Sequence, residues 1–363
     1  MKVALVHDWL TGLRGGEKVL EVLCEIFPEA TLFTLLHVPG STSPLIEDRP
    51  VRTAFTQSLP GARRFYRWYL PLFPWAIESL NLEGYDLVVS TSHCVAKGVL
   101  APPNAPHISY CHTPMRYVWD RFPDYFGTGF TAKFVFGPFA HYLRLWDAAS
   151  TPRVDRIIAN SAHVAARVRR FWGREVDAVI PPPVDTDFFV PAEAEDPENY
   201  FLIVSALVPY KRVDLAIDAF KGRKERLLIV GTGPEEERLR QRAGPNVELL
   251  GAVSSSELLG LYQRARGSLL PGVEDFGIAP VESQACGRPV VAFRGGGALE
   301  SVKDGETGVF FDEATPASLS AAVDKLLSLS FNRVVVRSWA LQFSRSRFKQ
   351  AIESFVEETL ADK

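Results

Sequence analysis

The sequence predicts an α/β protein with two domains, each built around a parallel sheet. Its 363 residues exceed the usual size of a single hydrophobic core, so two domains are expected. Short apolar runs alternate with segments of helical periodicity along the chain, which is typical of parallel sheets with crossover helices. Near the middle, Pro181-Pro182-Pro183 interrupts this alternation. Consecutive prolines end regular structure and suit a semi-rigid linker between domains.

The first half contains six candidate strands and two clear helical segments. Helices are predicted over Glu17–Phe27 and Ala162–Phe171, the second behind a cap at Asn160 or Ser161. The strands are predicted over Lys2–His7, Thr31–Leu36, Tyr85–Ser90, His107–Cys111, Arg156–Asn160 and Val176–Ile180.

The second half repeats this pattern after the polar run Pro191–Asn199, which extends the linker. A capping box over Ser254–Glu257 precedes a helix predicted over Leu258–Ala265. Thr315 is a suitable cap for a helix over residues 316–329 that begins with proline. The strands are predicted over Phe201–Ala206, Arg226–Val230, Val247–Leu250, Gly267–Leu270, Pro289–Phe293 and Gly308–Phe310.

Composition narrows the class of protein. The net charge of −3 argues against a nucleic-acid partner, which would require a basic stripe. The four cysteines lie far apart and the chain opens on a predicted strand, so we expect free thiols, no signal peptide and a cytoplasmic location. No uncharged apolar run approaches the length of a membrane span.

The most informative segment runs from Glu274 to Glu282, with two glutamates eight positions apart. A helix is predicted over Pro280–Cys286 with its proline at the first helical position. Glu274 is then expected on the preceding loop and Glu282 in the first turns. Backbone N–H groups near Gly277 to Ala279 would form an anion site at the positive end of the helix dipole. Two carboxylates beside this site could accept hydrogen bonds from hydroxyl groups on either side of the phosphates. A nucleotide sugar is a ligand of this kind.

This segment resembles the Glu-x7-Glu motif of retaining glycosyltransferases of family 4, which have the GT-B fold. The resemblance implies two Rossmann-like domains facing each other across a cleft, over residues 1–182 and 183–343. It also implies that residues 344–363, with the candidate helix Arg345–Leu360, return to the first domain. Four segments carry the resemblance in the order of the family: Leu10–Glu17, Ser109–Pro114, Ser205–Asp214 and Ile229–Pro234, ahead of the two glutamates.

Lys211 and Arg212 follow a predicted strand and open a helix, so their charges start near the carboxyl end of the sheet. Ligands of open α/β sheets bind at that edge. Fixed cations there can stabilise the charge of a departing diphosphate. A solvated surface pair is the alternative. Many family members have an arginine at the position of Ala206, so the phosphate contact here would depend on Lys211, with Arg212 or a residue of the first domain compensating.

The loop with Gly15 and Gly16 lies between the first strand and helix, and adjacent glycines let backbone approach a sugar or phosphate closely. The resemblance implies that this loop closes over the donor and that Gly16 borders the acceptor. A tight turn is the alternative. A dinucleotide site is disfavoured, because the spacing Gly12-x-x-Gly15-Gly16 departs from Gly-x-Gly-x-x-Gly.

His112 follows a predicted strand, with Arg116 close behind it. A lone histidine is more often structural, but the strand end and the family match favour a functional role. The resemblance implies that His112 is catalytic, near the donor hexose or leaving group, and that Arg116 lies on the acceptor side. A neutral imidazole can accept a hydrogen bond from a sugar hydroxyl, and a protonated imidazole can donate a hydrogen bond to a phosphate.

The resemblance also implies individual roles in the donor site. Glu282 would hold the ribose, Glu274 would orient the hexose and act in catalysis with Lys211, and the amides of Gly277 and Ile278 would hold the diphosphate. Val253 and Phe276 complete the expected donor contacts. No cofactor and no metal are expected.

Two further patterns could indicate a metal site. Asp185-Thr186-Asp187 spells an Asp-x-Asp but follows the prolines of the linker, so we interpret it as structural. The pairs His93-Cys94 and Cys111-His112 lack the usual spacing of zinc ligands.

Tyr110–Asp120 and Pro209–Asp214 resemble mannosyltransferases of surface-polysaccharide assembly. GDP-mannose is therefore the first expected donor, with UDP-hexoses still open, and a saccharide or polyprenyl-linked saccharide the expected acceptor. A GT-B-like sugar-nucleotide epimerase and an inactive sugar-nucleotide-binding protein are the alternatives.

The segments Arg63–Trp75 and Phe130–Trp146 are both basic and aromatic. Such mixtures suit a peripheral contact with a membrane surface. They equally suit helices that bury their aromatic side chains against a sheet, so both interpretations stand at this point.

Overall fold

The computed structural model describes residues 1–193 and 197–362, and the chain divides into two compact units. One unit comprises Met1–Pro183 together with Phe348–Lys363, and the other comprises Val184–Arg347. The predicted linker begins at the junction of these units. Residues 194–196 of its polar run, and residue 363, lie outside the described residues.

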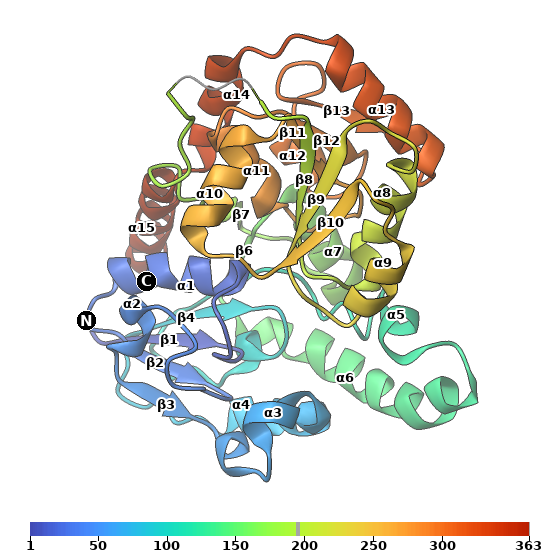
Figure 1. The fold of residues 1–363 in the computed structure, drawn as a ribbon. Helices are drawn as coiled ribbons and strands as arrows, with labels where there is room; N and C mark the ends of the chain where they lie inside the picture. The colour runs from blue at the N-terminus through green and yellow to red at the C-terminus, as the bar shows by residue number, and fades with distance from the viewer. Residues whose placement is uncertain (194–196, 363) are drawn as a thin grey trace. The chain divides into compact units, whose positions relative to one another are not determined.

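The first unit contains a parallel sheet in the order β3-β2-β1-β4-β5-β6-β7 (Figure 1). The chain builds outward from β1 to β3, then returns to place β4 on the other side of β1. This reversal creates a switch point between β1 and β4, where ligands of open α/β sheets bind. The predicted strands are confirmed, and a short edge strand, β3, was not predicted. The strands are β1 (Val3–His7), β2 (Thr31–Thr34), β3 (Val51–Thr53), β4 (Leu87–Ser92), β5 (His107–Cys111), β6 (Arg156–Ala159) and β7 (Ala178–Val179).

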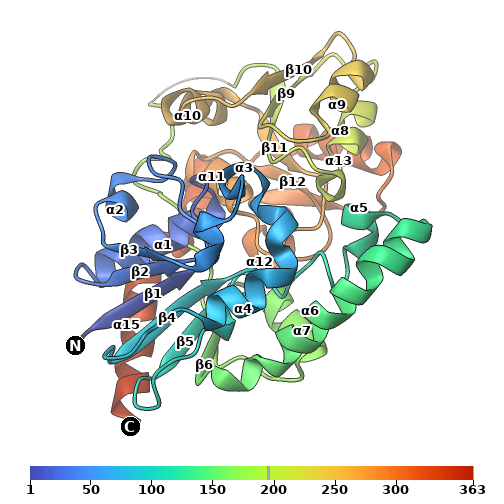
Figure 2. The ribbon, with the colours of Figure 1, turned by 90° about the horizontal axis from the view of Figure 1, so that it is seen from below.

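Helices cover both faces of this sheet (Figure 2). Side chains alternate between the faces of a strand. Val3 and Leu5 of β1 therefore pack with α1 and α15, while Ala4 and Val6 pack with α4 and α6. The helices are α1 (Gly15–Ile26), α2 (Pro44–Glu47), α3 (Ala62–Phe65), α4 (Phe73–Glu78), α5 (Phe122–Phe126), α6 (Gly137–Ala149), α7 (Ala162–Trp172) and α15 (Arg345–Ala361), with short turns η1 (Phe55–Ser58), η2 (Tyr66–Leu72), η3 (Ala96–Gly98), η4 (Ala132–Phe136) and η5 (Thr151–Arg153).

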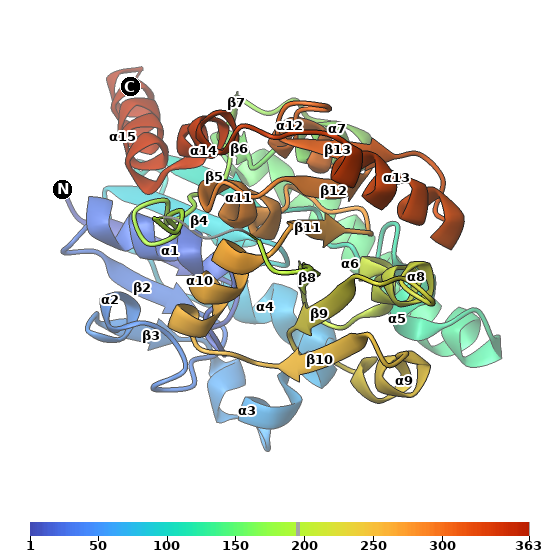
Figure 3. The ribbon, with the colours of Figure 1, turned by 45° about the horizontal axis from the view of Figure 1, so that its top comes forward.

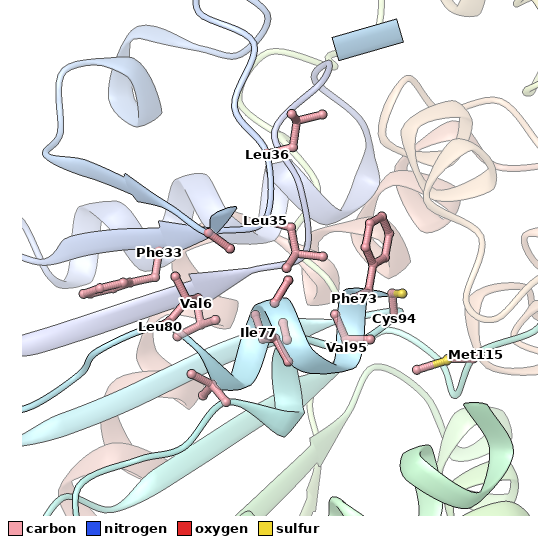
Figure 4. Packing of buried hydrophobic residues seen from close by; sticks show 14 of the residues in the cluster. Val6, Phe33, Leu35, Leu36, Phe73, Ile77, Leu80, Cys94, Val95 and Met115 are labelled. Carbon is pink, nitrogen blue, oxygen red and sulfur yellow. The ribbon is translucent and has the colours of Figure 1, made fainter. Parts of the chain in front are cut away.

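The core under α4 holds the switch-point loops in place (Figure 4). Phe73 and Ile77 of α4 belong to the same buried cluster as Val6 of β1. Cys94 and Val95, which follow β4, are buried in this cluster as well. The loop that leaves β4 is therefore anchored by apolar packing, which favours burial of these side chains in proportion to their area.

The last helix, α15, packs on the first unit. Its residues Phe348, Ile352 and Phe355 are buried in one cluster with Val3 and Leu5 of β1. The expectation that the C-terminal helix returns to the first domain is therefore confirmed.

The second unit contains a parallel sheet in the order β10-β9-β8-β11-β12-β13 (Figure 3). Its predicted strands are confirmed. The chain runs from β8 outward to β10, then crosses back to β11, so the switch point lies between β8 and β11. The strands are β8 (Tyr200–Val204), β9 (Arg226–Val230), β10 (Val247–Gly251), β11 (Gly267–Leu270), β12 (Val290–Phe293) and β13 (Gly308–Phe311).

Helices α8, α9 and α13 cover one face of this sheet, and α10, α11 and α14 cover the other (Figure 3). Ser254 and Thr315 cap α10 and α13 as predicted, through side-chain oxygens that accept from Glu257 and Ser318 N–H groups. The helical segments are η6 (Pro209–Lys211), α8 (Val213–Ala219), α9 (Glu236–Arg242), α10 (Ser255–Arg264), α11 (Ile278–Ala285), α12 (Ala298–Ser301), α13 (Pro316–Ser328), α14 (Arg333–Ala340) and η7 (Leu341–Phe343).

The start of α11 differs from the prediction. The helix begins at Ile278, two residues before Pro280, because Gly277 adopts a left-handed conformation with φ of 94° and serves as the N-cap. Pro280 is tolerated at the third helical position, since N–H groups of the first turn have no intrahelical acceptor.

The aromatic segments of the first unit lie largely at its surface. Trp68 and Trp75 are 79% and 64% exposed, so the interpretation that they are core residues is wrong. Tyr66 and Phe73 of the same segment are buried instead. In the second segment, aromatic side chains from η4, from α6 and from the residues just before η4 are exposed: Phe130, Phe134, Phe139 and Tyr142. Within the described residues, no helix combines the length and apolar character needed to cross a membrane.

Candidate functional site

Two charged side chains meet at the switch point of the second unit. Lys211 ends η6, in the connection after β8, and Glu274 lies on the loop after β11. β8 and β11 are neighbours in the sheet, so their carboxyl ends present these loops side by side. The Lys211 ammonium and the Glu274 carboxylate form an ion pair. Their side chains are 18% and 15% exposed, which leaves the pair accessible to a ligand.

Gly272 allows this pair to form, because its backbone lies against η6. A Cβ atom at position 272 would lie 2.6 Å from the carbonyl oxygen of Tyr210 and 2.9 Å from Cα of Lys211. Any side chain there would displace backbone, so the approach of the two loops requires glycine. Sequence reasoning did not identify this residue.

A second glycine contact supports the Glu274 loop from the other side. Gly296 pairs with Glu274 in an isolated parallel bridge, and the Gly297 N–H donates to the Glu274 carbonyl at 2.9 Å. A Cβ atom at Gly297 would lie 2.2 Å from Cα of Phe276. The run Gly295-Gly296-Gly297 after β12 was a visible signal that sequence reasoning did not use.

The N-terminus of α11 follows Glu274 directly. The N–H groups of Ile278 and Ala279 belong to the first helical turn, where no intrahelical acceptor exists, and the helix dipole is positive at this end. Gly277 and Ile278 therefore lie where an anion site was predicted.

Glu282, one turn into α11, is buried with 4% of its surface exposed. The hydroxyl of Tyr262 on α10 donates to Glu282 Oε2 at 3.0 Å. Burial, and then the charge of Glu282, raises the pKa of Tyr262 well above its usual range, so the phenol remains a donor. Burial and the same carboxylate raise the pKa of Cys286 to about 12. Tyr262 thus positions Glu282, a role that the sequence did not reveal.

The other residues predicted to bind the donor lie near the same sheet edge, and their side chains differ in burial and contacts. Arg212 has a left-handed backbone with φ of 53°, and its guanidinium contacts Asp214 at 3.3 Å rather than joining Glu274. Phe276 is buried against Phe343, with ring centroids 5.3 Å apart, so its side chain belongs to the core. Val253 follows the end of β10 and is partly buried.

In the first unit, three imidazoles gather at the carboxyl edge of the sheet. His7 ends β1, His93 follows β4 and His112 follows β5. The His93 ring lies 6.1 Å from the His7 ring and 6.2 Å from the His112 ring, measured between centroids. A Cβ atom at Gly16 would lie 3.5 Å from His7 Cε1 and 3.6 Å from His112 Nε2, which is ordinary contact. Two residues of the predicted site, Gly16 and His112, therefore lie next to each other, while His7 and His93 were not among the predicted site residues.

The histidines are held by a network of buried polar groups. Asp8 is fully buried and accepts four backbone N–H groups, from residues 93–96, at 2.7–2.9 Å. The same carboxylate lies 3.1 Å from His93 Nδ1. His7 Nδ1 lies 2.5 Å from the Thr91 hydroxyl. Carboxylate bonds to several N–H groups are strong, so the loop after β4 has a defined position.

Burial lowers the pKa of both His112 and His93, which favours their neutral forms. Burial, and then the neighbouring histidines, lowers the pKa of His112 well below its usual range. Burial also lowers the pKa of His93, although Asp8 opposes the shift. Burial raises the pKa of Glu17, but His7, a backbone hydrogen bond and the charge of His93 together lower it, so the net shift is downward. His112 Nε2 is buried with no hydrogen-bond partner among the described residues, so it can accept a hydroxyl group from a ligand.

Arg116 lies four residues beyond His112 and is buried. Burial raises the pKa of Asp120, but the charges of Arg167 and then Arg116 lower it. The net pKa of Asp120 lies below its usual value. Gly15 begins α1 next to Gly16.

Neither metal-like pattern of the sequence forms a metal site among the described residues. Asp185 Oδ1 accepts the N–H of Phe188 at 3.1 Å, so this carboxylate stabilises a turn. Across residues 1–193 and 197–362, no three His, Cys, Asp or Glu side chains are arranged to hold a metal ion. Independence from metal remains a prediction.

Comparison with known protein families finds one match in each half of the chain. The family described as "Glycosyltransferase Family 4" matches residues 13–188, and the family described as "Glycosyl transferases group 1" matches residues 185–338. Together these matches extend over most of the chain.

Two curated relatives match about half of the chain. A D-inositol 3-phosphate glycosyltransferase from Acidothermus cellulolyticus is 31% identical over 56% of this chain and 52% of its own length. A GDP-mannose-dependent alpha-(1-6)-phosphatidylinositol monomannoside mannosyltransferase from Mycolicibacterium smegmatis is 36% identical over 51% of this chain and 59% of its own length. The chain thus spans little more than half the length of these relatives.

Solved structures share the fold over the whole chain. HepE from Anabaena, solved in complex with UDP, has a TM-score of 0.72 at 16% identity and covers 99% of this chain and 100% of its own. Sucrose-phosphate synthase from Thermosynechococcus elongatus has a TM-score of 0.75 at 18% identity and covers 100% of both chains. At these identities the likeness concerns the fold alone.

Proposed function

Because the chain belongs to the group 1, family 4 glycosyltransferases with the GT-B fold, we propose that it transfers a hexose from a nucleotide diphosphate sugar. The acceptor is a saccharide or a lipid-linked saccharide. One observation carries this proposal: the Lys211–Glu274 ion pair, the N-terminus of α11 and the buried Glu282 follow one another at the switch point of the second unit. This is where open α/β sheets bind nucleotides.

Each part of the nucleotide sugar has a binding partner of suitable chemistry at this switch point. The amides of Gly277 and Ile278 bind the diphosphate together with Lys211. Glu282, positioned by Tyr262, accepts hydrogen bonds from the ribose hydroxyls. Glu274 orients the hexose. GDP-mannose is the first candidate donor, supported by the name of the M. smegmatis relative.

We assign retention of configuration to the reaction. The bond between the anomeric carbon and the diphosphate breaks, and its electron pair moves to the leaving oxygen. The acceptor hydroxyl attacks from the same face, and its proton passes to the departing diphosphate. Lys211 stabilises the charge that develops on this group, an effect of about 3 kcal/mol for one well-placed donor. Neutral His112 accepts a hexose hydroxyl and thereby orients the sugar.

We place the enzyme in the cytoplasm as a peripheral protein of the membrane surface. The exposed aromatic side chains of η4 and α6, with Lys133 among them, have the mixture of apolar and basic groups that suits a lipid interface. Nucleic acid and resident cofactors have no part in this proposal.

A panel of nucleoside diphosphates tests the proposal. We expect GDP to raise the unfolding temperature of the full chain more than UDP or ADP, because a ligand that binds only the folded state stabilises it. The nucleotide sugar with the best-bound base should then be hydrolysed slowly without acceptor, releasing a sugar of retained configuration in nuclear magnetic resonance spectra. Absence of a shift with any nucleotide would refute the proposal. Epimerised donor in place of free sugar would point to an epimerase.

A further inference from the structure

An arginine-lined hollow in the first unit has no role in the donor chemistry described above. Its volume is about 340 Å³, which lies within the range of about 300–1,000 Å³ typical of small-molecule pockets. Two segments form it: the turn from β1 into α1, and the segment that α3 and η2 make. Its principal lining residues are Thr11, Arg14, Arg63, Arg64, Arg67 and Trp68.

No ion pair among the described residues compensates the charge of this hollow. Among the described residues, no acidic side chain lies within 4.0 Å of the guanidinium groups of Arg14, Arg63, Arg64 or Arg67. The chain as a whole is acidic, with a net charge of −3, so four arginines without an ion pair around one hollow are a local concentration of positive charge. Like charges held close together repel, and a bound anion removes that cost.

Aromatic neighbours hold two of the arginines. The Arg64 guanidinium lies 5.3 Å from the centroid of the Phe65 ring, and that of Arg67 lies 5.5 Å from the Tyr66 ring. Cations over aromatic faces are attracted to them, which reduces the motion of the long side chains. Arginine in such a setting is suited to phosphate, since its planar fork matches two phosphate oxygens.

A buried hydroxyl adds a neutral donor. Thr11 Oγ1 is buried and has no hydrogen-bond partner among the described residues. Buried polar atoms are rarely left unsatisfied in folded proteins. A ligand oxygen in the hollow would provide the missing acceptor.

The hollow adjoins the histidine cluster through Trp9. The Trp9 ring lies 5.3 Å from the Tyr66 ring and 4.5 Å from the His93 ring, measured between centroids. Arg14 is close enough for its charge to be among the effects that lower the pKa of His93, after burial and His7. Trp9 therefore connects the wall of the hollow to the histidine cluster at this sheet edge.

From this geometry we infer that the arginine-lined hollow binds a phosphate or diphosphate group carried by the acceptor substrate. This inference rests on the proposed transferase function and specifies its acceptor as a phosphorylated amphiphile. The anionic group is held by Arg63, Arg64 and Arg67, with Arg14 and the Thr11 hydroxyl at the other wall. Trp68, which is 79% exposed at the rim, provides apolar surface for the lipid portion next to the phosphate.

Calorimetric titration of the full chain with geranyl diphosphate tests this inference. We expect saturable binding to the unmodified protein, weakened at least tenfold by the triple substitution R63Q/R64Q/R67Q. A triple substitution of other exposed arginines of the same unit, R52Q/R169Q/R170Q, removes equal charge and should change the affinity less than twofold. Lys211→Ala should also leave it unchanged, because Lys211 serves the donor.

Each of the following results would overturn the inference. Equal losses in both triple variants would indicate non-specific charge attraction. Loss in Lys211→Ala alone would place geranyl diphosphate in the donor site. Arginine-dependent binding to phosphatidylglycerol vesicles without binding of geranyl diphosphate would assign the arginines to a lipid surface.

The donor site provides an independent measurement. The R63Q/R64Q/R67Q variant should bind GDP within twofold of the unmodified protein, which also shows that it is folded. If the unmodified protein binds geranyl diphosphate through these arginines but no nucleoside diphosphate, the proposed function fails while the anion site stands. If nucleotides bind and geranyl diphosphate does not, only the acceptor inference fails.

Discussion

Replacement of Tyr262 by phenylalanine tests how the second unit positions Glu282. The substitution removes one hydroxyl group and keeps the ring, so it leaves no large cavity. Tyr262 is fully buried, and the lost hydroxyl donates to Glu282 Oε2 at 3.0 Å. The carboxylate stays almost completely buried after the change, so water cannot easily replace the lost donor.

The expected magnitude follows from the charge of the acceptor. A hydrogen bond to a charged group contributes about 1.5–3 kcal/mol, and we expect a loss of that size in the free energy of unfolding of the second unit. A carboxylate freed from Tyr262 also orients less well toward the ribose, so GDP affinity should fall about tenfold, or about 1.4 kcal/mol. Glu282→Ala should weaken nucleotide binding by about 1–3 kcal/mol.

Urea unfolding and calorimetry with GDP measure the two effects separately. Tyr200→Phe is the matched control, since the Tyr200 hydroxyl is a donor to the neutral Leu261 carbonyl at 2.7 Å in the same unit. Its loss should cost about 0.5–1.5 kcal/mol of stability and leave GDP binding unchanged.

Two outcomes would refute this reasoning. If Tyr262→Phe weakens GDP binding no more than Tyr200→Phe does, Tyr262 does not position a ligand group. If Glu282→Ala binds GDP as tightly as the unmodified protein, Glu282 does not hold the ribose, and the assignment of the donor site must change.

Four other variants probe the donor site and the surface. Glu274→Ala should lower turnover far more than affinity for the bare nucleoside diphosphate; loss of diphosphate binding in calorimetry would contradict its role at the hexose. Lys211→Ala should lower turnover about 100-fold, and activity of the unmodified enzyme should survive EDTA; a strict requirement for Mn²⁺ or Mg²⁺ would contradict charge stabilisation by Lys211. Gly297→Ala should lower the free energy of unfolding of the second unit by about 1–3 kcal/mol in urea, because its Cβ would lie 2.2 Å from Cα of Phe276. An unchanged urea midpoint of unfolding would show that the loop has room to move. Replacing Phe130 and Phe134 by serine should abolish co-sedimentation with phosphatidylglycerol vesicles without affecting donor hydrolysis; undiminished vesicle binding would exclude this surface as the membrane contact.

Local patterns in the sequence were sufficient to predict most strands and several helix ends. The cap at Ser254 and the strand β8 each depend on residues within a few positions of one another, so their signals are readable without the fold. The edge strand Val51–Thr53 was not predicted because three residues carry too little periodicity. The start of α11 was misplaced because the left-handed Gly277, rather than the proline, sets the cap.

The candidate site was only partly visible in the sequence. Lys211 and Glu274 could be placed at strand ends, but they are 63 positions apart, and their ion pair depends on the adjacency of β8 and β11. His7 and His93 were not recognised, since each alone resembles an ordinary core histidine. Strand order in the first sheet brings them together.

For the aromatic segment near Trp68, the sequence by itself determined composition but not burial. Alternation of exposed and buried rings follows from the short helical turns η2 and α4, which direct Tyr66 and Phe73 inward and Trp68 and Trp75 outward. Apolar and basic character is a property of each residue, so it can be read from the chain. Which side chains leave water, and which arginines surround a common hollow, depends on contacts between distant segments, and only the tertiary structure decides them.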